Sequence, residues 1–93
     1  MVAYSIYCWP AADAALTRLE TDPLKADVLR AVDRTLIRLA EDPFSPRLGT
    51  TSFMTEPLGG INATPVRVDE WYVIWQRGEP GSIEIVDVRE LPV

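Results

Sequence analysis

The C-terminal third of the chain is rich in residues that favour β-strands. The run from Val66 to Gln76 (VRVDEWYVIWQ) and the run from Ile83 to Arg89 (IEIVDVR) hold two of the three tryptophans and many β-branched residues. Such side chains suit a pleated, half-buried surface. Polar breaks, DE within the first run and RGEPG between the two runs, are typical of hairpin turns. The pattern predicts three antiparallel strands, over Thr64–Val68, Trp71–Gln76 and Ser82–Arg89.

A three-stranded meander needs a cover for its apolar face, and two upstream segments can supply it. Ala11–Glu20 is alanine-rich with one apolar stripe, which predicts a helix. A second helix is predicted over Pro23–Glu41, because apolar residues recur there at helical spacing. Asp22 is a suitable N-cap, and Asp42-Pro43 should end the helix because a residue before proline avoids the α region.

The remaining segments complete the expected fold. A first strand is predicted over Ala3–Cys8, where the period of the apolar residues is close to two, and Pro10 ends it. Residues 44–63 carry several prolines and glycines and resist assignment, although Thr50–Met54 suits a short strand or an ordered loop. The order β-α-α-β-β-β predicts one α+β domain over residues 1–93, a two-helix hairpin packed on a small antiparallel sheet that the first strand can join. Its core should contain Leu16, Leu19, Val32, Leu36, Leu39, Val73, Trp75, Ile83 and Ile85.

The amino-acid composition excludes several kinds of chemistry. The chain has no histidine and one cysteine, Cys8, so a Ser-His-Asp triad, a Cys-His pair, a His-ligated zinc and a four-cysteine metal site are excluded. No phosphate-binding glycine loop or EF-hand spacing is present, so we expect no cofactor and no metal. The net charge of −5 disfavours general nucleic-acid coating. Without a long apolar run or a disulfide framework, cytoplasmic residence is the default expectation.

Three segments carry a resemblance to a known family. The helix end LAEDP (Leu39–Pro43), the stretch RVDEWYVIW (Arg67–Trp75) and the strand end VDVR (Val86–Arg89), in this element order, resemble the RelE/ParE toxin superfamily. The resemblance implies the toxin of a type II toxin–antitoxin pair, with an antitoxin protein as partner. It implies either cleavage of mRNA on the ribosome, as in RelE-like members, or inhibition of DNA gyrase, as in ParE-like members.

The resemblance also points to three candidate site residues, Arg67, Tyr72 and Arg89. Both arginines match the family pattern, whereas Tyr72 stands where ribonuclease members usually carry the arginine that contacts the scissile phosphate. Residues 64–93 contain three arginines against six carboxylates, a local net of −3, where a ribonuclease needs positive charge. We therefore expect action by binding a target, and keep as alternatives a RelE-type endoribonuclease and a non-catalytic interaction module. Arg67 and Arg89 are expected first to form structural ion pairs with nearby carboxylates, and the alternative is contact with a phosphate or a partner, since a guanidinium serves either role.

The acidic residues lead to an expectation about the partner. The predicted end of the sheet and its loops carry six carboxylates, so an antitoxin segment that docks there should be basic. The six residues are Asp69, Glu70, Glu79, Glu84, Asp87 and Glu90.

Overall fold

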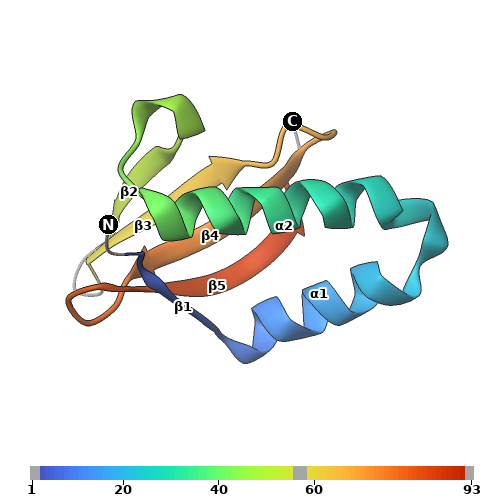
Figure 1. Cartoon of the computed structure of the whole chain (residues 1–93), viewed down its shortest axis with the longest axis horizontal. Coiled ribbons are helices and arrows are strands. Elements are labelled where there is room, and N and C mark those ends of the chain that lie inside the picture. Colours follow the sequence, from blue (N-terminus) through green and yellow to red (C-terminus); the bar gives the residue numbers. More distant parts are fainter. Residues whose placement is uncertain (1–2, 56–58, 92–93) are drawn as a thin grey trace.

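The computed structural model describes residues 3–55 and 59–91 and has two helices packed on a five-stranded mixed sheet (Figure 1). This α+β arrangement confirms the predicted fold class. The strands are β1 (Ser5–Cys8), β2 (Thr51–Thr55), β3 (Gly59–Pro65), β4 (Trp71–Arg77) and β5 (Ser82–Glu90). The helices are α1 (Pro10–Thr21) and α2 (Ala26–Glu41), with the 3-10 turns η1 (Pro23–Lys25) and η2 (Pro46–Leu48).

The sheet has the strand order β1-β5-β4-β3-β2. β2 to β5 pair antiparallel, as expected for the meander, but β1 runs parallel to β5, with Ser5 opposite Ser82 and Cys8 opposite Ile85. The sheet is therefore mixed, where an antiparallel one was expected. The two helices between β1 and the meander return the chain to its starting end, and the Tyr4 N–H donates to the Ala40 carbonyl there at 2.7 Å. Such a return allows parallel pairing.

The first strand of the meander differs from its predicted range, Thr64–Val68. β3 begins at Gly59 and ends at Pro65, and residues 66–70 form the connection to β4. Arg67 and Asp69 in this connection have φ angles of +68° and +50°, a left-handed conformation that ends the strand. Val66, a strand-forming residue by type, is buried in the core and its N–H donates to the Trp71 carbonyl at 3.0 Å.

The segment that resisted assignment contains regular structure. η2 is followed by β2, which pairs with β3 from Thr51 opposite Ala63 to Thr55 opposite Gly59. The possible strand Thr50–Met54 is therefore real and lies at Thr51–Thr55. Residues 56–58 of this segment lie outside the described residues.

α1 extends one residue beyond its predicted range at each end, and η1 and α2 together span the predicted second helix, because local signals set these ends. The Asp22 carboxylate accepts a hydrogen bond from the Leu24 N–H at 3.0 Å, as expected of an N-cap. The predicted second helix starts with the 3-10 turn η1 and continues as α2. α2 ends at Glu41, and the Asp42 carboxylate accepts from the Phe44 N–H at 3.1 Å, which stabilises the turn that follows.

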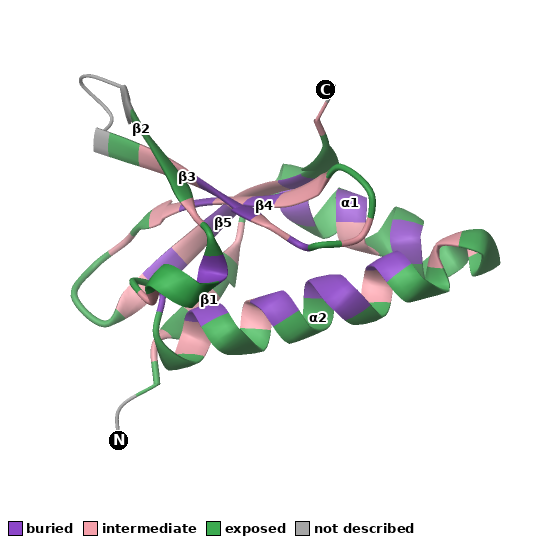
Figure 2. Cartoon of the chain, turned by 90° about the horizontal axis from the view of Figure 1, so that it is seen from above, coloured by how far each residue is buried: buried purple, intermediate pink, exposed green. Residues whose placement is uncertain are grey.

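The core lies between the helices and one face of the sheet (Figure 2). Leu19, Val32, Leu39, Val73, Trp75, Ile83 and Ile85 are buried as predicted. The other two predicted core residues, Leu16 and Leu36, are half-buried and pack against the edge of this cluster. Within residues 3–55 and 59–91, no helix covers the opposite face of the sheet, and none is long and apolar enough to cross a membrane.

An irregularity in β5 decides which of its side chains face the core. Ile74 of β4 pairs with Asp87, but the next residue, Trp75, pairs with Ile85, so Val86 is an extra residue on β5. Such a bulge reverses the alternation of side chains. Ile85 and Val88 can therefore both be buried although they are three residues apart. Without the bulge, Arg89 would share the face of Ile83 and Ile85.

Candidate functional site

Two of the three predicted site residues lie side by side on the sheet. Tyr72 of β4 is directly opposite Arg89 of β5, and opposite Pro65 of β3 on its other side. The neighbouring residues Val73 and Val88 face the core, so Tyr72 and Arg89 point to the face that the helices leave uncovered. Tyr72 is half-buried and Arg89 is exposed. The arrangement presents a hydroxyl and a guanidinium together on the open face.

Arg67 lies apart from this pair, in the connection between β3 and β4. Its Nη2 donates to the Arg47 carbonyl at 3.4 Å, and a Cβ atom on Gly49 would lie 2.9 Å from the same nitrogen. The side chain therefore packs against the chain around η2. Gly49 fits this close approach and also has a φ of +69°. The sequence led us to consider an ion pair or a ligand contact for Arg67. The structure instead shows a hydrogen bond to a backbone carbonyl.

A hollow of about 520 Å³ between α1 and the C-terminal half of β5, the α1–β5 hollow, borders Arg89. Its charged lining residues are balanced in number: Arg18, Lys25, Arg89, Asp22, Asp87 and Glu90. Trp71 also lines it, with the Lys25 ammonium 6.0 Å from its ring centroid. Within the described part of the chain, the buried Nε1–H of Trp71 has no hydrogen-bond partner.

Sequence reasoning did not associate Arg18 or Lys25 with this site. Both belong to the helical half of the chain and approach β5 only through the packing of α1 and η1. No motif links them to Arg89, so the sequence offered no signal for them. Arg18 and Lys25 add two positive charges to the lining of the hollow, and the carboxylates Asp22, Asp87 and Glu90 equal the three cations of that lining in number.

Five of the six carboxylates that were expected to form one acidic surface fall into two groups. Asp69, Glu70 and Glu90 lie at the β3–β4 connection, where the Leu91 N–H donates to the Glu70 carbonyl at 2.9 Å. Glu79 and Glu84 lie near the other end of β4, in and after the β4–β5 turn. Asp87 is on β5 between them, opposite Ile74. The expectation of a basic docking segment therefore concerns mainly the first group and stays a prediction.

The chemistry available at the site is narrow. A guanidinium can hold a phosphate or a carboxylate through two N–H groups, and a tyrosine hydroxyl can donate or accept a hydrogen bond. The described residues contain no group of three or more Cys, Asp or Glu placed to hold a metal ion. Burial, and secondarily the charge of Asp13, raises the pKa of the Cys8 thiol, so the thiol is protonated at neutral pH and is a poor nucleophile.

Comparisons with known proteins identify the fold. No protein-family model matches the sequence, and a search of curated proteins also gives no match. A chain in the crystal structure of the RelBE2 toxin–antitoxin complex from Mycobacterium tuberculosis superposes with a TM-score of 0.69 at 19% sequence identity. The match covers 98% of this chain and 94% of the other. This chain therefore shares the fold of that chain, and the α+β fold implied by the sequence resemblance is confirmed.

Proposed function

We propose that this chain is the toxin of a toxin–antitoxin pair, which acts by binding a cellular target and is neutralised by its antitoxin. The observation that carries the proposal is the similarity of fold over 98% of the chain to a chain of a toxin–antitoxin complex. The three sequence segments that resemble the RelE/ParE superfamily support it independently. Fold alone does not define activity, so the proposal needs a direct test.

The composition of the open face favours binding over RNA cleavage. The transition state of phosphoryl transfer gathers negative charge, which catalytic sites stabilise with several cations. Here Tyr72 replaces the arginine that the resemblance expects, and Arg67 points to the Arg47 carbonyl instead of toward Arg89. Arg89 is the one cation on the Tyr72 row of the sheet, Pro65-Tyr72-Arg89. Target binding through this row requires no such charge.

The test is growth of a bacterial host that expresses the chain from an inducible promoter. We expect growth arrest, and rescue when a small neighbouring gene from the native genome is expressed with it. Arg89→Gln should relieve the arrest if the Tyr72–Arg89 row contacts the target. Arg30→Gln, which makes the same charge change on the exposed side of α2, should leave the arrest intact. Growth unaffected by the wild-type chain at confirmed expression would favour the non-catalytic interaction module.

The antitoxin segment that docks near Asp69, Glu70 and Glu90 is expected to be basic. Complementary charge mainly accelerates association, so the association rate should fall as salt rises. An acidic partner, or a rate indifferent to salt, would show that these carboxylates are not the recognition surface. Two assays of the purified protein distinguish the two classes of target. Inhibition of DNA supercoiling would indicate gyrase, and an effect on translating ribosomes would indicate the ribosome.

The second candidate function is ribosome-dependent endoribonuclease, and the pairing of Tyr72 with Arg89 is the observation in its favour. We expect the purified protein to cut ribosome-bound mRNA weakly or not at all. Tyr72→Arg should raise the rate, because it adds a cation beside Arg89 that can stabilise the pentavalent phosphate. Strong cleavage by the wild type that falls about 100-fold in Arg89→Ala would establish the ribonuclease instead.

A further inference from the structure

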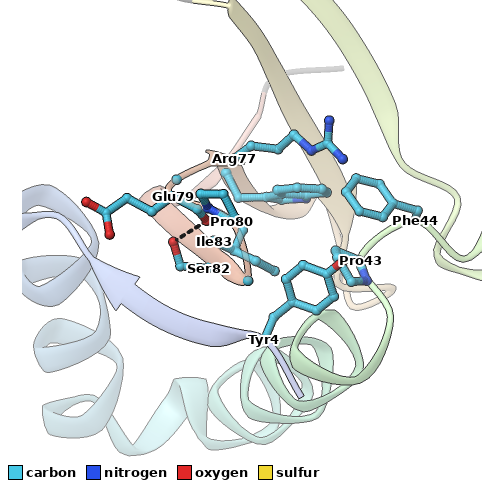
Figure 3. A pocket seen from close by; sticks show the side chains of 11 residues that line it. Tyr4, Pro43, Phe44, Arg77, Glu79, Pro80, Ser82 and Ile83 are labelled. Atoms are coloured by element: carbon cyan, nitrogen blue, oxygen red, sulfur yellow. Dashed lines mark hydrogen bonds between the residues drawn. The ribbon is translucent and has the colours of Figure 1, made fainter. Parts of the chain in front are cut away.

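Two adjoining hollows lie on either side of Phe44, which follows α2 by three residues. The first hollow, about 430 Å³, lies between Phe44 and the β4–β5 turn (Figure 3). The second hollow, about 360 Å³, lies between Phe44 and the strands β2 and β3. Pro43, Phe44 and Trp75 line both. The exposed ring of Phe44 therefore borders both hollows.

The first hollow is apolar and rigid at its base. Trp75 and Ile83 are each 1% exposed, and Pro43 is also buried, so these lining residues belong to the packed core. The ring centroid of Phe44 lies 6.1 Å from that of Tyr4, edge to face, and 6.3 Å from that of Trp75. Phe44 nevertheless remains 50% exposed. A preformed apolar compartment beside an exposed aromatic ring suits one large apolar side chain.

The mouth of the first hollow is positive. The guanidinium carbon of Arg77 lies 4.6 Å from the Phe44 ring centroid, and Figure 3 shows the guanidinium beside that ring, with Glu79 pointing away from it. Glu84, the other nearby carboxylate, accepts hydrogen bonds from Trp9 Nε1 and Gln76 Nε2 at 3.1 and 2.9 Å. A stacked guanidinium keeps its in-plane N–H groups available for a carboxylate. The charge that fits this mouth is therefore negative.

The second hollow has a mixed lining, in which polar side chains lie beside Pro43, Phe44, Pro46 and Trp75. Its lining residues include Ser45, Thr50, Ser52 and Asn62, and the Ser52 hydroxyl donates to Asn62 Oδ1 at 2.6 Å. Side chains two residues apart on an extended chain point the same way and are separated by about 6–7 Å. One extended segment can thus place neighbouring same-side residues on the two sides of the Phe44 ring.

We propose that these two hollows bind an extended segment of a partner protein. The segment places a large apolar side chain in the first hollow, a small polar side chain in the second, and a carboxylate against Arg77. The site is at the opposite end of β4 from the β3–β4 connection, and it does not depend on the proposed toxin function.

The test uses short acetylated, amidated peptides and the intact protein. Ser-Gly-Leu-Asp-Gly and its reverse, Gly-Asp-Leu-Gly-Ser, cover both chain directions. Binding is followed by NMR titration, with the Trp75 indole and Phe44 backbone signals as reporters. In the better direction, we expect replacement of the peptide Asp by Asn to weaken binding about tenfold, since an ionised hydrogen bond is lost. Replacement of the peptide Leu by Gly should abolish measurable binding.

Variants of the protein assign the contacts. The Arg77→Gln variant should bind the Asp and Asn peptides within about twofold of each other. Both the protein change and the peptide change remove the same contact, between the Arg77 guanidinium and the peptide carboxylate. Arg30→Gln, with the same charge change on α2, should keep the full preference for Asp. Thermal unfolding of both variants checks that the fold is intact.

Three outcomes would overturn the proposal. One is no binding of either peptide at millimolar concentration, and another is a preference for Asp that Arg77→Gln leaves unchanged. The third is equal affinity for N-acetyl-leucine, which carries the apolar group and the carboxylate but nothing for the second hollow. That result would indicate a small-molecule site. None of these measurements depends on growth arrest. Failure of the peptide-binding proposal therefore leaves the toxin proposal standing, and failure of the toxin proposal leaves the peptide-binding proposal standing.

Discussion

Leu39→Ala is expected to lower the free energy of unfolding by about 2–5 kcal/mol, the usual cost of emptying a fully buried leucine site. Leu39 is 0% exposed and belongs to the cluster that joins α2 to the sheet. Leu36, on the same helix, is half-buried and packs at the edge of that cluster. Leu36→Ala should therefore cost less than Leu39→Ala, because part of its side chain is already in water.

Ile37 supplies the matched control for this comparison. It lies on α2 between the two leucines and is 59% exposed, so Ile37→Ala should change stability by no more than about 1 kcal/mol. Urea unfolding followed by tryptophan fluorescence measures all three variants against the wild type. A loss below about 1 kcal/mol for Leu39→Ala would mean that the opposite face of α2 packs on the sheet.

Thr64→Val is expected to destabilise the protein by about 1–3 kcal/mol, although the two side chains have nearly the same shape. The Thr64 hydroxyl is buried and accepts a hydrogen bond from Trp75 Nε1 at 2.8 Å. It also lies 2.7 Å from the Thr50 hydroxyl, so it connects β3 both to the core tryptophan and to the residue before β2. Valine would leave the buried indole N–H without an acceptor, which is the costly kind of lost hydrogen bond.

Thr35→Val is the control for this change. Thr35 is also buried, but its hydroxyl donates to the Ala31 carbonyl at 2.8 Å, one turn earlier on the same helix. That carbonyl keeps its helical N–H donor when the hydroxyl is removed, so no buried group loses its only partner. Thermal or urea unfolding should therefore show a smaller loss for Thr35→Val than for Thr64→Val. Equal losses of stability in the two variants would show that replacing a buried hydroxyl by a methyl group, and not the loss of the acceptor for the Trp75 indole, causes the effect.

The candidate site was only partly predictable. Arg67, Tyr72 and Arg89 could be named from their places in short sequence patterns, and pairing between adjacent strands brings Tyr72 and Arg89 together. Arg67 could not be placed, because its backbone adopts a left-handed conformation in a connection that was expected to continue a strand. The hollows beside Phe44 combine Tyr4, which precedes β1, with residues of the segment after α2 and of β2 to β5, and no local pattern joins these segments.

The sequence by itself determined the elements whose limits depend on nearby residues. Asp22 with Pro23, and Asp42 with Pro43, mark the ends of the helices because capping and the restricted backbone of proline act over one to three residues. The apolar stripe of α2 likewise predicts its buried face, since helical periodicity is local. The β-branched runs predict strands at β4 and β5 for the same reason.

Only the tertiary structure decided the pairing and the faces of the strands. The parallel position of β1, the addition of β2 and the burial of Val66 outside β3 depend on partners far away in sequence. The bulge at Val86 is the clearest case, because it lets Ile83, Ile85 and Val88 all enter the core and turns Arg89 to the open face. Strict alternation along the sequence predicts the opposite direction for Arg89. The burial of Val88 against the helices outweighs regular pairing, and no local signal in β5 records that competition.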